Sequence, residues 1–93
     1  MSRDAQPNVR VLFGRKLRLV RQERGYSQEQ LADRAGLDRT YVSSCERGKR
    51  NISLENIWRL ARALGVDPSE LISNRPAEFA PGPYDSADEK ADG

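Results

Sequence analysis

Four short or basic side chains recur at helical spacing near the middle of this sequence. They are Arg39, Thr40, Ser43 and Ser44, and the sequence predicts that they form the outward face of one helix. Packing does not account for a face of this composition, since its members are short or charged. Arginine can bond bidentately to guanine O6 and N7 in the major groove, and serine or threonine hydroxyls can bond base edges or phosphates. These residues therefore predict contact with double-stranded DNA.

A basic loop follows this helix directly and contains Arg47, Lys49, Arg50 and Asn51. Such a loop in isolation would be an ordinary solvated turn. Its place immediately after a helix of the composition just described favours contact with the sugar-phosphate backbone.

Catalytic and metal chemistry is poorly represented in the sequence. There is no histidine and one cysteine, Cys45, which removes most metal sites and the histidine-dependent nucleophile pairs. The carboxylates Glu23, Glu29 and Asp33 fall on helix faces that we expect to be exposed, where they serve as solubilising charge. We therefore expect no enzyme, no cofactor and no metal, and we expect Cys45 to be a small core residue.

The net charge of +2 combines two unlike segments. Residues 1–73 hold 14 Lys plus Arg against 9 Asp plus Glu, a net charge of +5, and residues 74–93 hold 2 against 5, a net charge of −3. The second segment is rich in proline and has almost no aliphatic residues beyond alanine, so we predict a disordered acidic tail. Residues 1–8 are predicted to be a flexible N-terminus, which leaves residues 9–73 as one domain. The lack of an apolar run of about 18 residues and of a signal peptide predicts a cytoplasmic protein.

Helical spacing of apolar residues recurs through that domain, with breaks at glycines and no strand-like alternation. The sequence predicts an all-α fold with helices at about 9–24, 28–35, 39–47, 54–64 and 68–72. The N-caps predicted for these helices are Asn8, Ser27 in a capping box with Gln30, Asp38, Ser53 and Asp67. The inward positions predicted for the first, second and fourth helices are Phe13, Leu17, Val20, Leu31, Ala32, Ala35, Leu54, Ile57, Ala61 and Leu64. For Trp58 two alternatives remain open, a position in the core and a position at a dimer interface.

Small and apolar residues in the stretch 28–47 fall where two helices must cross closely. Ala32 leaves room for the next helix, Gly36 takes a sharp turn, and Leu37, Val42 and Cys45 are predicted to be buried. This is the pattern of a helix-turn-helix.

Residues 13–72 resemble the Cro and phage-repressor type of helix-turn-helix proteins, the Xre family. The resemblance lies in FGRKLRLVRQERGYSQEQLA, GLDRTYVSSCERGKRNISLENI and RLARALGVDPSELI, and LDRTYVSSCERGKRNIS also resembles the controller proteins of restriction-modification genes. It implies a five-helix, lambda-repressor-like domain. It also implies a dimeric transcriptional regulator that binds pseudo-palindromic operators, with a homodimer formed through the fourth and fifth helices.

The resemblance also implies roles for individual residues. Gln28 would contact a phosphate and brace a side chain of the recognition helix, Ser27 would cap its helix and reach a phosphate, and Arg21 and Glu46 would form a partly buried structural ion pair. The base-reading positions would be Arg39, Thr40, Ser43 and Ser44, and the backbone-contacting positions Arg47, Lys49, Arg50 and Asn51.

Three residues depart from the family pattern. Tyr41 replaces a small residue and would either reach DNA or pack along its backbone. Cys45 replaces a larger aliphatic residue, and Ile52 stands where proline is common.

Two alternative uses of the tail remain open in the sequence. Phe79 and Tyr84 suggest an antitoxin-like or other interaction protein whose tail binds a protein partner. Alternatively, the acidic tail competes with DNA for the basic face.

Overall fold

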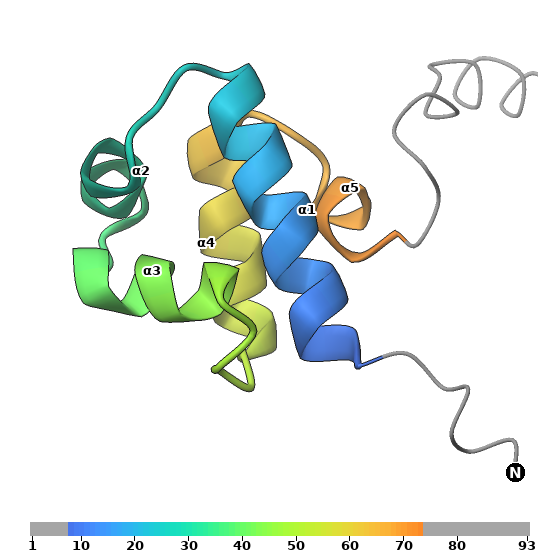
Figure 1. Cartoon of the computed structure of the whole chain (residues 1–93). Coiled ribbons are helices and arrows are strands. Elements are labelled where there is room, and N and C mark those ends of the chain that lie inside the picture. The colour runs from blue at the N-terminus through green and yellow to red at the C-terminus, as the bar shows by residue number, and fades with distance from the viewer. Residues whose placement is uncertain (1–7, 74–93) are drawn as a thin grey trace, which may run out of the picture.

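The computed structural model describes residues 8–73, and in this range the chain is all-helical. The helices are α1 (Val9–Glu23), α2 (Gln28–Ala35), α3 (Arg39–Glu46), α4 (Leu54–Leu64) and α5 (Pro68–Ile72), arranged as shown in Figure 1. The predicted fold class is confirmed, and each helix ends within one residue of its predicted end. Except for Asn8, the predicted flexible N-terminus lies outside the described residues, as does the predicted acidic tail. No helix among the described residues is long and apolar enough to cross a membrane.

Capping residues fix most helix starts as the sequence predicts. Asn8 accepts hydrogen bonds from the backbone of the first turn of α1, and Ser27 and Gln30 form the reciprocal capping box of α2. Ser53 and Asp67 cap α4 and α5 in the same way. Asp38 is the exception: it occupies the N-cap position of α3, but its side chain makes no capping hydrogen bond. The backbone donors of the first turn of α3 are therefore without a side-chain acceptor from Asp38.

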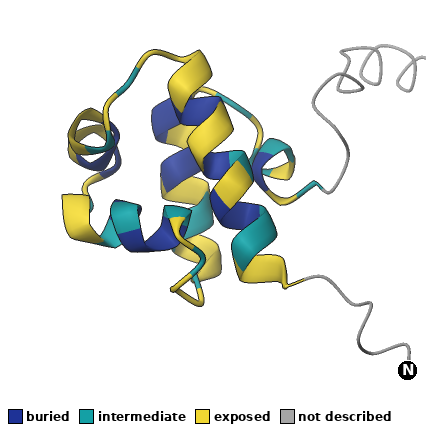
Figure 2. Cartoon of the chain, in the orientation of Figure 1, coloured by how far each residue is buried: buried dark blue, intermediate teal, exposed yellow. Residues whose placement is uncertain are grey.

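The core lies where the five helices meet, and buried residues occupy the faces that the helices turn toward one another (Figure 2). Leu17, Leu31, Val42, Cys45, Leu60 and Leu71 are its fully buried members. The prediction that Leu54 points inward is wrong, because its side chain is 72% exposed. Leu60, which is fully buried, sets the core face of α4. Leu54 precedes it by six residues, about 240° around a helix, and cannot share that face.

Helix α1 approaches α3 most closely at Gly14, a residue that the sequence reasoning did not single out. A Cβ atom at Gly14 would lie 2.5 Å from the carbonyl oxygen of Cys45 and 2.6 Å from that of Glu46. Only glycine therefore lets α1 pack this close to the C-terminal end of α3.

Candidate nucleic-acid interface

Helices α2 and α3 form a helix-turn-helix whose turn is fixed by backbone geometry. Gly36 ends α2 in the left-handed conformation, with φ of +72°. The next residue, Leu37, donates its backbone N–H to the carbonyl of Ala32 at 2.9 Å and packs partly buried against the core. The turn therefore sets the direction in which α3 leaves α2.

The outward face of α3 contains three of the four residues predicted for it. Arg39 and Thr40 are exposed in the first turn, and Ser43 is partly exposed one turn later. The Nη1 atom of Arg47 donates to the hydroxyl of Ser43 at 2.8 Å, which joins the start of the basic loop to this face.

The prediction that Ser44 belongs to the outward face is wrong. Ser44 is only 9% exposed, and its hydroxyl donates to the carbonyl oxygen of Thr40 at 2.8 Å. The cause is the chain that follows α3, which folds back over this residue. The backbone N–H of Lys49 donates to the Ser44 carbonyl at 3.0 Å, and Nε of Arg50 donates to its hydroxyl at 3.5 Å.

Tyr41 joins α3 to the basic loop and to α4. Its ring lies beneath the guanidinium of Arg50, 5.0 Å from ring centroid to Cζ. Its hydroxyl accepts a hydrogen bond from Nδ2 of Asn56 at 2.9 Å. Sequence reasoning missed Asn56, because a polar residue in the first turn of α4 carries no signal of a partner fifteen residues earlier.

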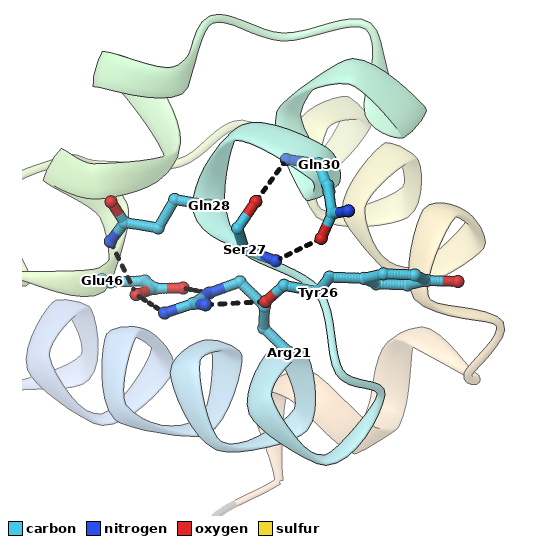
Figure 3. A network of polar contacts seen from close by, with 6 residues as sticks. All are labelled: Arg21, Tyr26, Ser27, Gln28, Gln30 and Glu46. Carbon is cyan, nitrogen blue, oxygen red and sulfur yellow. Dashed lines mark hydrogen bonds and ion pairs between the residues drawn. The ribbon is translucent and has the colours of Figure 1, made fainter.

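The polar network at the C-terminal end of α3 contains the ion pair that the resemblance implies (Figure 3). Nε of Arg21 donates to Oε2 of Glu46 at 2.6 Å, Nη2 donates to Oε1 at 2.9 Å, and Nη1 donates to the carbonyl of Tyr26 at 2.8 Å. Nε2 of Gln28 adds a hydrogen bond to Oε1 of Glu46 at 3.0 Å. The hydrogen bond to Glu46 raises the pKa of Arg21 above its ordinary value, against the opposing effect of burial. Helices α1, α2 and α3 are thus tied together by one buried carboxylate.

The basic loop is held at the first turns of α1. Gly48 has a φ of +73°, and a Cβ atom placed on it would lie 2.8 Å from Cγ2 of Val11. Lys49, Arg50 and Asn51 are exposed beyond this contact. The loop therefore presents its positive charges beside the outward face of α3 from a fixed backbone.

Cys45 lies in the core beneath this surface, as expected. It is a free, fully buried thiol, and burial raises its pKa to about 11. The protonated form therefore dominates at neutral pH, where only the thiolate is a good nucleophile.

Comparison with known proteins assigns this arrangement to a family. The helix-turn-helix family model HTH_3 matches residues 17–71, from the middle of α1 to α5. The chain belongs to this helix-turn-helix family. The predicted resemblance to the Xre type is confirmed, and the family is one of DNA-binding transcription regulators.

Control proteins of restriction-modification systems are among the relatives of this family member. Control protein C.BamHI of Bacillus amyloliquefaciens is 50% identical over 66 residues, which are 70% of this chain and 82% of that protein. Control protein C.MunI of a Mycoplasma species is 46% identical over 68 residues, 72% of this chain and 92% of that protein. The crystal structure of the restriction-modification controller protein C.AhdI from Aeromonas hydrophila is 55% identical. It superposes with a TM-score of 0.66 over 67% of this chain and 94% of that one.

Proposed function

We propose that this member of the helix-turn-helix family is a sequence-specific regulator of transcription that binds double-stranded DNA as a dimer at pseudo-palindromic operators. The observation that carries the proposal is the outward face of α3. Arg39, Thr40 and Ser43 are accessible, whereas the rest of α3 is covered. Its other faces pack on the core, bond to α1 through Glu46 and lie beneath the loop that folds back after the helix. A rigid helix with a short, polar outward face suits the major groove.

Two groups of residues would contact different parts of the DNA, the base edges and the phosphates. The first turn of α3 would read base edges, with Arg39 as the residue able to make a bidentate contact. Phosphate contacts would come from Ser27, Gln28, Arg47, Lys49, Arg50 and Asn51, whereas Tyr41, also predicted to reach DNA, would support Arg50 from beneath. These contacts would set the register of the protein on the duplex and supply much of the affinity through counterion release.

Exposed apolar residues on α4 support the dimer. Leu54 and Trp58 are 72% and 59% exposed. Large apolar groups of this exposure are natural contacts for a second copy, and Trp58 is an interface residue in this arrangement rather than a core residue. Binding to successive major grooves would require the two copies of α3 in this dimer to lie about 34 Å apart, one turn of DNA.

The test combines operator selection with one substitution. Sequences bound by the full chain are first selected from a random pool of duplexes, and we expect a palindromic motif to be enriched. Arg39→Ala should then weaken binding to that motif about 5- to 150-fold, as expected for loss of a bidentate base contact, and weaken binding to a random duplex much less.

Arg59→Ala is the matched control, because Arg59 is an exposed arginine on α4 outside the predicted contact set. It should bind both duplexes as the parent chain does. Failure to enrich any motif would overturn the proposed function, and equal losses on motif and random DNA would remove Arg39 from the base-reading residues.

A further inference from the structure

An apolar groove runs between α1, the loop before α4, α4 and α5, on a part of the surface that the DNA proposal does not use for base reading. Its volume is about 360 Å³, and its lining includes Phe13, Ile57, Leu71 and Ile72. Helix α5, which lies beside α1 (Figure 1), contributes Leu71 and Ile72 to the lining of this groove. A groove of this size is at the lower end of the range for ligand sites and suits an aromatic side chain.

Two arginines give the lining of this groove a positive charge. Arg10 and Arg50 both line it, and the side chain of Arg10 has no hydrogen bond or ion pair with any other residue in the range 8–73. The first turn of α1 also contains no acidic residue, although a helix N-terminus favours negative charge. An occupant that pairs an aromatic ring with a carboxylate would therefore complement both parts of the groove.

The chain itself supplies such a segment beside the groove. Ser73, the last described residue, lines the groove, and the sequence continues as NRPAEFAPGPYD. Phe79 follows Ser73 by six residues and has Glu78 directly before it. Six residues can span up to about 20 Å, which is ample for a side chain that starts from the groove itself.

We propose that Phe79 occupies this groove in the same chain, with the carboxylate of Glu78 paired to the guanidinium of Arg10. The ring packs on the accessible parts of Ile57 and Ile72, and the carboxylate neutralises the positive charge at the first turn of α1. Phe79 fits better than Tyr84, because it follows Ser73 by six residues rather than eleven and has Glu78 directly before it. This inference does not depend on DNA binding.

Methyl NMR on the full chain tests the placement of Phe79. We expect nuclear Overhauser contacts between the Phe79 ring and the methyl groups of Ile57 and Ile72. Phe79→Ala should move those methyl signals and lower the Tm by about 4–8 °C, the shift expected for a domain of this size when one apolar contact is lost. Tyr84→Ala is the matched control and should change neither.

A sample that mixes methyl-labelled and unlabelled chains separates the same-chain contact from its competitors. We expect no contact between chains in the groove. Contacts between chains would show that a second copy fills it. Methyl shifts as large in Tyr84→Ala as in Phe79→Ala would show that the groove does not select Phe79. Either result overturns the proposal.

A second substitution tests the charge pairing. Glu78→Gln should shift the NMR signal of the Arg10 side chain and weaken the Phe79 contacts, whereas Asp85→Asn, the matched change beside Tyr84, should leave both unchanged. If the NMR signal of the Arg10 side chain is the same in Glu78→Gln as in the parent chain, Glu78 does not pair with Arg10.

Discussion

Helix α3 is attached to the rest of the molecule at two places that differ in kind. At its C-terminal end, the carboxylate of Glu46 receives three hydrogen bonds, two from Arg21 and one from Gln28, and the side chains of Arg21 and Glu46 are only 10% and 4% exposed. In the first half of α3, the half-buried Tyr41 accepts one neutral hydrogen bond from Asn56, and the guanidinium of Arg50 stacks on its ring.

The difference shows how a recognition helix can be both rigid and accessible. The C-terminal end is fixed by charge-assisted bonds in a dry setting, where such bonds are strong and their loss is costly. The first turn, with Arg39 and Thr40, has no side-chain cap from Asp38, and its polar side-chain link to another helix is the neutral hydrogen bond between Asn56 and Tyr41. The polar side-chain attachment of α3 is therefore weaker at the end that would meet base edges.

The largest effect should come from breaking the buried attachment. Glu46→Gln removes the charge that compensates Arg21 and leaves a guanidinium buried without a partner of opposite sign. We expect the free energy of unfolding to fall by about 3–5 kcal/mol, measured from urea unfolding followed by circular dichroism.

Glu55→Gln is the control for this substitution, because Glu55 is an exposed carboxylate on α4. It should change stability by about 0.5 kcal/mol or less. A Glu46→Gln chain as stable as the Glu55→Gln chain would mean that the two attachments of α3 do not differ in strength.

Helix positions and the ion pair could be predicted from the sequence, whereas the polar contacts around Tyr41 could not. Caps such as Ser27 and glycines such as Gly36 act within a few residues, so their signals are local. Arg21 and Glu46 were found through a family resemblance rather than through their spacing. The burial of Ser44 depends on how the chain after α3 folds back, and the partnership of Tyr41 with Asn56 depends on where α4 lies. Neither is encoded in a local pattern.

Gly14 is a further part of the C-terminal attachment that no local pattern marks. Gly14→Ala should destabilise the fold by about 1–2 kcal/mol, although alanine favours a helix by about 1 kcal/mol over glycine. The added Cβ atom would meet two backbone carbonyl oxygens of α3, at 2.5 and 2.6 Å, and overpacking of this kind outweighs the gain in propensity. The urea midpoint measures the change.

Arg15→Ala, an exposed position on the same helix, is the control for this crossing. It should stay within about 0.5 kcal/mol of the parent chain. If Gly14→Ala proved more stable than the parent, α1 and α3 would have room to separate, and the C-terminal attachment would be less rigid than the distances indicate.

The smallest effect should come from the neutral attachment, and a double-mutant cycle sharpens the contrast with Glu46. Tyr41→Phe keeps the ring beneath Arg50 and removes the acceptor of the Asn56 hydrogen bond, so we expect a loss of about 0.5–1.5 kcal/mol in the free energy of unfolding. Asn56→Ala should cost a similar amount. Because both substitutions remove the same bond, the double variant should lose clearly less than the two losses added together. Additive losses would show that Tyr41 and Asn56 act independently, and α3 would then be held by its C-terminal end and the packing of its core face alone.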